Sequence, residues 1–183
     1  MPEPRWTLLV HSGGADDGEV CLAAARAGAT VLRYGGGAVQ AVEAALRSFR
    51  RGSGEDVDAP LDGLITDGRT LRAMGDDGAA GRGRWGAVAF DGEGHLAAGG
   101  WGDAHADDAA GAASVLGGPA ASRVVQALEE GVEPRSAAAA AGGSAVVVDR
   151  RGRIGLAPGG GALAMAEAGS EPRLMGSREL LDG

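Results

Sequence analysis

A chain of 183 residues, 44% of them hydrophobic, is long enough to bury a sizeable core and is not a disordered chain. Its formal net charge of -8 at pH 7 argues against nucleic acid or an anionic membrane as a partner. Cys21 is the single cysteine, which excludes an internal disulfide. No long apolar region follows the N-terminal residues. We therefore expect neither a signal peptide nor a membrane span, but one cytoplasmic domain over residues 1–183.

The first part of the chain predicts one strand and two helices. Residues 6–11 form a short, mostly apolar run that residues 12–14 end. Apolar residues then recur at helical spacing over residues 19–34 and 38–50, and the glycines at 35–37 separate these two runs. We therefore expect an αα-hairpin behind the first strand.

Paired strands dominate the rest of the chain. Turn residues rich in Asp and Gly separate the members of three pairs, which are residues 61–66 and 70–74, 86–90 and 95–99, and 144–148 and 154–157. Two helices are expected between the second and third pairs, at residues 120–130 and 135–141. Strands and helices do not alternate, so the order favours an α+β fold with two antiparallel sheets and outer helices.

Several local motifs stand in an order that is informative as a whole. They are Val-His-Ser-Gly-Gly at residues 10–14, a Gly-rich turn and Ala-Val-rich helix within 28–42, Phe-Arg-Arg-Gly-Ser-Gly at 49–54, Leu-Asp-Gly-Leu-Ile-Thr-Asp-Gly at 61–68, and Gly-Ala-Val-Ala-Phe-Asp at 86–91. In this order they resemble the plant-type asparaginase and isoaspartyl-peptidase family almost end to end. The resemblance implies the N-terminal-nucleophile hydrolase fold, a four-layer αββα sandwich, here uncleaved and minimised. It also implies a homodimer.

The chain departs from this family where the family's chemistry lies. The family nucleophile is a threonine that self-cleavage makes N-terminal, and Arg84 stands at that position. A guanidinium stays protonated and has no acceptor, so it cannot attack a carbonyl. Both supporting threonines read as glycine within residues 99–104, and the loop that grips the substrate's charged groups is absent. We therefore expect no autoproteolysis and no ordinary asparaginase activity.

Two classes of function remain open. In the first, the pocket is rebuilt to bind or modify a different small molecule, in a specialised biosynthetic pathway. In the second, the chain is a non-catalytic scaffold or interaction subunit. A residual amide hydrolase with another nucleophile is a third option, for which Ser12 is the nearest hydroxyl, although a serine in a glycine turn more often bonds the backbone. The glycine run at residues 159–161 lacks a strand-Gly-helix context, and we expect no cofactor.

His11 and an acidic cluster are the candidate catalytic groups. His11 ends a strand beside a glycine turn, where an imidazole can act as a base or ligand. We favour the alternative, a structural imidazole that bonds a neighbouring backbone group. Alternation places Asp103, His105 and Asp107 on one side of an extended segment, which suits proton transfer or a divalent ion. We favour an acidic surface loop there and assign no metal.

The candidate binding residues are Ser12, Asp62, Arg84, Trp85 and Trp101. A carboxylate such as Asp62 in an apolar strand needs a partner or a raised pKa. Arg84 is a candidate for that partner, or for the group that grips an anionic ligand. Trp85 and Trp101 either stack on a planar or apolar ligand or fill the space left by deleted loops.

Overall fold

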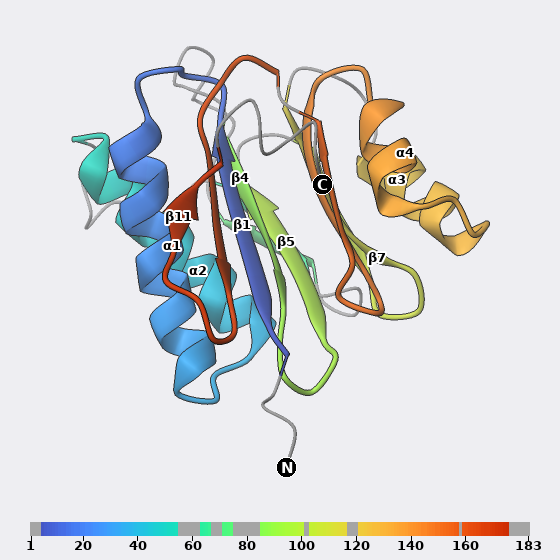
Figure 1. Ribbon diagram of the computed structural model, residues 1–183, viewed down its shortest axis with the longest axis horizontal. Coiled ribbons are helices and arrows are strands. Elements are labelled where there is room, and N and C mark those ends of the chain that lie inside the picture. Colours follow the sequence, from blue (N-terminus) through green and yellow to red (C-terminus); the bar gives the residue numbers. More distant parts are fainter. Residues whose placement is uncertain are drawn as a thin grey trace.

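The computed structural model describes residues 5–54, 63–66, 71–74, 85–100, 103–116, 121–157 and 159–175, with the backbone alone at 63–66 and 71–74. Within these residues the chain is an α+β protein of two antiparallel sheets with helices (Figure 1). In chain order the elements are β1 (Thr7–Ser12), α1 (Gly18–Arg33), α2 (Ala38–Gly52), β2 (Gly63–Thr66), β3 (Leu71–Met74), β4 (Trp85–Phe90), β5 (Leu96–Gly100), β6 (Asp103–Asp107), β7 (Gly111–Leu116), α3 (Ala121–Glu129), α4 (Pro134–Ala139), β8 (Ser144–Asp149), β9 (Ile154–Ala157), β10 (Leu163–Glu167) and β11 (Arg173–Leu174).

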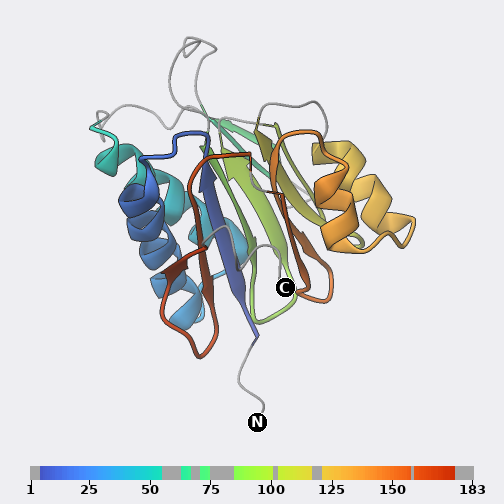
Figure 2. The same cartoon turned by 45° about the horizontal axis from the view of Figure 1, so that its top comes forward.

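The two sheets differ in size. The larger sheet has the strand order β11-β10-β1-β4-β5-β2-β3, and the smaller one has the order β6-β7-β8-β9. In the larger sheet β1 pairs with both β10 and β4, so the first strand of the chain lies in its interior. Figures 1 and 2 show α1 and α2 beside the larger sheet and α3 and α4 beside the smaller one. This arrangement is compatible with the expected sandwich.

Three apolar clusters fill the spaces between these elements. One lies between the larger sheet and the α1–α2 hairpin, and a second lies between α3, α4 and the smaller sheet. The third lies where the sheets face each other and includes Leu9, Val88, Val146 and Met165. Most of the buried side chains are small, so the elements approach one another closely.

Gly28 shows how close this approach is. A Cβ atom at Gly28 would lie 2.4 Å from Leu8 Cδ2 and 2.7 Å from the Ala41 carbonyl oxygen. Real Cβ contacts are not this short, so β1, α1 and α2 meet at a position that only glycine allows. The glycine-rich composition is therefore part of the packing of the expected αα-hairpin.

The structure confirms the expected helices and strand pairs and adds four strands. The interpretation of residues 103–108 as a surface loop is wrong, because residues 103–107 form β6, which pairs with β7. Strands β7, β10 and β11 were not expected either. No helix in the described part of the chain is long and apolar enough to cross a lipid bilayer.

Candidate functional site

His11 brings a polar group into the interface between the two sheets. Side chains alternate along β1, so Val10 packs toward the helices while Leu9 and His11 face the smaller sheet. His11 Nε2 lies 2.9 Å from Ser114 Oγ of β7, and His11 Nδ1 lies 3.1 Å from Ser144 Oγ of β8. The expected backbone partner is therefore wrong. Two serine hydroxyls from the other sheet hold the imidazole instead.

Burial determines the protonation state of His11. The side chain is 1% exposed, and desolvation lowers the pKa of the imidazole to about 3. The ring is therefore neutral at physiological pH. A neutral imidazole has one N–H donor and one acceptor nitrogen, so it bonds one serine as a donor and the other as an acceptor.

Gly86 provides the space for this cluster. It lies opposite His11 in the β1–β4 pairing. A Cβ atom at Gly86 would lie 2.1 Å from Ser114 Oγ and 3.2 Å from His11 Nε2. The missing side chain therefore lets a strand of the smaller sheet bring its hydroxyl to the imidazole.

Ser12 lies next to His11 in sequence but on the other face of the sheet. Its hydroxyl donates a hydrogen bond to Asp17 Oδ2 and accepts one from the Gly14 backbone N–H at 3.1 Å. Ser12 therefore bonds locally within its turn, as the turn-bonding interpretation expects. Asp17 occupies the N-cap position of α1, but its side chain makes no capping hydrogen bond.

The glycine run at residues 159–161 lies against Ser12 and Ser144. A Cβ atom at Gly159 would lie 2.7 Å from Ser144 Cβ, and one at Gly161 would lie 1.8 Å from the Ser12 carbonyl oxygen. Gly160 has a φ of +85°. The backbone of this run therefore passes directly beside Ser144, where no other residue type fits.

The acidic cluster lies on the face of β6 that points away from the space between the sheets, where Ala104 and Ala106 pack. Asp103, His105 and Asp107 alternate with buried alanines and are exposed on β6, as the alternation predicted. Asp103 Oδ2 accepts the N–H of Ala121, the first residue of α3, at 2.9 Å, and Asp107 Oδ1 accepts the N–H of Ala109 at 2.7 Å. Both carboxylates thus bond the backbone. No group of three or more His, Cys, Asp or Glu residues within the described ranges is placed to hold a metal ion.

Trp85 lies in the core. Its side chain is 2% exposed, and its ring stacks on Phe49 of α2 with centroids 4.8 Å apart. This contact supports the space-filling interpretation of Trp85. The expectations for Arg84, Trp101 and Asp62 fall outside the described residues.

Cys21 has the properties of a core residue. It is fully buried in α1, and desolvation, followed by the charge of Asp17, raises the pKa of its thiol to about 12. A thiol that stays protonated is neither a good nucleophile nor a metal ligand.

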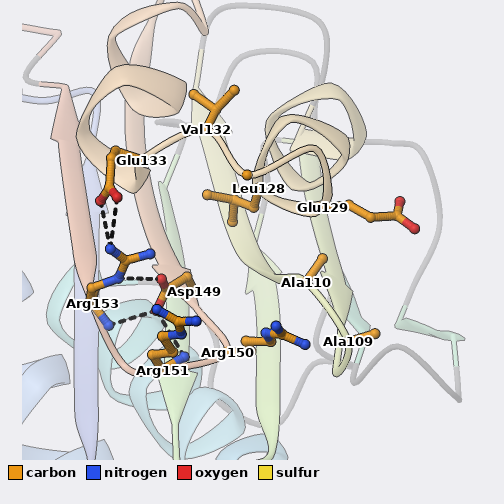
Figure 3. A pocket seen from close by; sticks show the side chains of 11 residues that line it. Ala109, Ala110, Leu128, Glu129, Val132, Glu133, Asp149, Arg150, Arg151 and Arg153 are labelled. Atoms are coloured by element: carbon orange, nitrogen blue, oxygen red, sulfur yellow. Dashed lines mark hydrogen bonds and ion pairs between the residues drawn. The ribbon is translucent and has the colours of Figure 1, made fainter.

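A pocket of about 480 Å³ lies at the Asp149 end of β8 (Figure 3). Ser144 is the residue at the other end of that strand. Leu128 and Val132 supply apolar surface, and three arginines and three acidic residues line the rest, namely Arg150, Arg151, Arg153, Glu129, Glu133 and Asp149. The formal charges of the lining therefore balance. None of the site residues expected from the sequence lines this pocket.

An ion-pair network occupies one wall of that pocket. Arg153 Nε donates to Asp149 Oδ2 at 2.7 Å, and its Nη1 donates to both carboxylate oxygens of Glu133 at 2.8 and 2.9 Å. The bonds to Asp149 and then to Glu133 raise the pKa of Arg153. Figure 3 shows this network on one side, with the carboxylate of Glu129 pointing away. These ion pairs account for the charged side chains Asp149 and Arg153 at the β8–β9 turn, so a ligand is not needed to explain them.

Sequence reasoning identified His11 but neither of its partners. Ser114 and Ser144 lie 103 and 133 positions further along the chain. No local pattern marks them, because serine is common on strands and the pairing arises only when the sheets meet. The motif that begins at Gly86 was visible in the sequence. The sequence did not show that Gly86 makes room for the Ser114 hydroxyl.

Comparison with known protein families finds no family model that matches this chain. A search of curated proteins likewise finds no match.

Proposed function

We propose that this protein is an asparaginase-like domain that has lost the family's nucleophile and now uses the His11 end of its sheets to bind or modify a different small molecule. The observation that carries the proposal is the His11 cluster, in which a neutral imidazole connects Ser114 and Ser144 across the two sheets. A buried polar group of this kind is costly unless it is fully bonded. Its position at a strand end suits a binding function.

The position of the cluster agrees with the family resemblance. Ser12, the residue after His11, pairs with Trp85, the first residue of β4. Arg84, which stands at the family's nucleophile position, directly precedes Trp85 in the sequence. Trp85, the described residue that follows the altered nucleophile position, thus lies at the same end of the larger sheet as His11. On this proposal the fold is an uncleaved, shortened N-terminal-nucleophile sandwich.

Surface composition favours this function over an interaction subunit. The large hydrophobic side chains exposed in the described ranges are Tyr34, Val132 and Leu174. Leu174 lies beside Gly18 at the start of α1, Tyr34 follows the other end of this 16-residue helix, and Val132 follows α3 beside the smaller sheet, so these residues do not form one patch. Protein-binding surfaces usually present contiguous apolar area.

Two assays test the altered chemistry. Intact mass spectrometry after prolonged incubation should show one unbroken chain, because Arg84 cannot act as a nucleophile. A coupled ammonia assay should show no release from asparagine, and β-aspartyl dipeptides should remain uncleaved. Fragments split between Gly83 and Arg84, or robust ammonia release, contradict the proposal.

Ligand capture tests the binding function. The protein is incubated with a metabolite extract, separated from free compounds and examined by native mass spectrometry. Wild type and His105→Gln should retain the same compound, and His11→Gln should lose it. His105 is a matched control because it is exposed on β6 and lies on the opposite face of the strand from Ala104 and Ala106, which pack between the sheets. Retention of no compound, or equal retention by His11→Gln, argues against this site.

A further inference from the structure

We propose that the Ser144 hydroxyl, oriented by His11 and Ser114, is a hydrogen-bond donor that holds the carboxylate of a small ligand beside the glycine run at residues 159–161. This inference rests on the proposed function and names the ligand class of the same site. It follows from counting hydrogens in the His11 cluster and from the position of the glycine backbone.

Ser114 determines the direction of the hydrogen bonds. Its side chain is fully buried, and His11 Nε2, at 2.9 Å, is its hydrogen-bonding partner among the described residues. A buried hydroxyl hydrogen without an acceptor is strongly disfavoured. Ser114 therefore donates its hydrogen to Nε2, which must be the unprotonated nitrogen of the ring.

The direction of the Ser114 bond also determines the direction of the hydrogen bond between His11 and Ser144. A neutral histidine that accepts at Nε2 carries its hydrogen on Nδ1, so Nδ1–H donates to Ser144 Oγ across 3.1 Å. Ser144 cannot then donate to His11. In this tautomer His11 does not act as the base for a Ser144 nucleophile, which separates the arrangement from a Ser–His catalytic pair.

The series of hydrogen bonds from Ser114 through His11 ends at Ser144, whose hydroxyl hydrogen is directed away from His11. Ser144 is partly exposed, and its own hydroxyl hydrogen has no acceptor in the described part of the chain. Hydrogen bonds that run in one direction polarise one another, which strengthens the terminal donor. The matching ligand atom is therefore an oxygen acceptor.

The glycine run adds further donors next to Ser144. A Cβ atom at Gly159 would lie 2.7 Å from Ser144 Cβ, so the Gly159 backbone passes close to Ser144, and Gly159 and Gly160 are exposed. The backbone N–H groups of residues 159–161 make no hydrogen bond with any residue that the structure describes. A hydroxyl donor beside N–H donors suits a carboxylate, whose two oxygens accept strong charge-assisted bonds.

The tautomer of His11 tests the first step without a ligand. Two-bond ¹H–¹⁵N correlation spectra of protein labelled with ¹⁵N-histidine distinguish the protonated ring nitrogen. We expect His11 to carry its hydrogen on Nδ1 at neutral pH, and Ser114→Ala to shift the population toward Nε2–H. A wild-type signal from the Nε2–H tautomer, or from a doubly protonated ring, overturns the inference.

A titration tests the ligand class. Succinate is added to ¹⁵N-labelled protein, with succinamide as the uncharged analogue and Ser136→Ala, an exposed serine on α4, as the matched control. Succinate should shift the amide signals of Ser144 and residues 159–161, and succinamide should bind more weakly. Ser144→Ala should weaken succinate binding by about tenfold or more. Ser144→Cys, a weaker donor of similar size, should give an intermediate loss.

The outcomes separate this inference from the proposed function. Succinate shifts that are absent, or unchanged in Ser144→Ala and Ser144→Cys, overturn the carboxylate assignment. The proposed function still stands if wild type retains an extract compound that His11→Gln loses. A folded Ser144→Ala variant is recognised by an otherwise unchanged amide spectrum, and Ser144→Cys provides the test if that variant does not fold.

Discussion

A histidine enclosed by two sheets has to stay neutral, and this requirement links the stability of the protein to pH. The buried imidazole of His11 is tolerated at this position because Ser114 and Ser144 form hydrogen bonds with both of its ring nitrogens. Gly86 makes the arrangement possible by leaving room for the Ser114 hydroxyl. At the residue scale, the site is therefore a set of mutually dependent side chains, and changes at one of them act through the others.

His11 should make the protein less stable as the pH falls. The pKa of His11 is about 3 in the folded protein and about 6.5 in an unfolded chain, so between these values the unfolded state binds a proton that the folded state does not. The free energy of unfolding therefore decreases below pH 6.5, by up to about 1.4 kcal/mol per pH unit. Urea unfolding between pH 5 and 7.5 should show a shallower dependence for His11→Gln. Equal slopes contradict this prediction.

Gly86→Ala should disrupt the cluster through a steric overlap. The new methyl group would lie 2.1 Å from Ser114 Oγ, so the strands must separate or the hydroxyl must rotate. We expect a loss of about 1–3 kcal/mol of unfolding free energy, measured by urea denaturation. Removing the overlapping oxygen tests the cause. The double variant Gly86→Ala/Ser114→Ala should be more stable than the sum of the single effects implies, and strict additivity argues against this contact.

At the scale of elements, two hairpins share one construction. Asp91 follows β4 and Asp149 ends β8, and each carboxylate accepts the backbone N–H groups two and four residues further on. The remaining oxygen of Asp91 accepts the N–H of Ala38 at the start of α2, while that of Asp149 accepts from Arg153. The turn sequences predicted both hairpins. They did not show that the Asp91 carboxylate connects its turn to α2, or that Arg153 connects the Asp149 turn to Glu133.

Asp91→Ala should destabilise the protein substantially. The substitution leaves three backbone N–H groups without their acceptor, including the buried one of Ala38. We expect a loss of about 2–4 kcal/mol of unfolding free energy, because an orphaned buried donor costs about 1–3 kcal/mol. Asp16→Ala is the control, since Asp16 is exposed in the first loop, and its effect should stay within about 0.5 kcal/mol. Similar small effects for both variants contradict the assigned role.

Strands β6 and β10 show where prediction from local patterns failed. The sequences Asp-Ala-His-Ala-Asp and Leu-Ala-Met-Ala-Glu contain few residues that favour strands. Each becomes a strand because small side chains pack against a neighbour, with β6 paired to β7 and β10 paired to β1. Tertiary contact therefore overrides weak local preference in both segments.

At the scale of the whole molecule, four strands form the edges of the two described sheets. The outer strands of the described sheets are β11 and β3 in one and β6 and β9 in the other. The family resemblance implies a dimer through such edges, and a short, aromatic-poor core gains stability by burying more surface. We expect a homodimer by light scattering, and a monomer at high micromolar concentration contradicts this expectation.

The sequence alone determined the helical hairpin, the turn-separated strand pairs and the α+β class, because these depend on local periodicity and on turn residues. It also identified His11 as a candidate and Arg84 as a residue that cannot be the family's nucleophile. Only the tertiary structure determined the partners of His11. Ser114 and Ser144 reach it from the opposite sheet, more than 100 positions away. The protonation state of His11 was equally invisible, because it depends on desolvation by the packed sheets and on the hydroxyls that satisfy the ring.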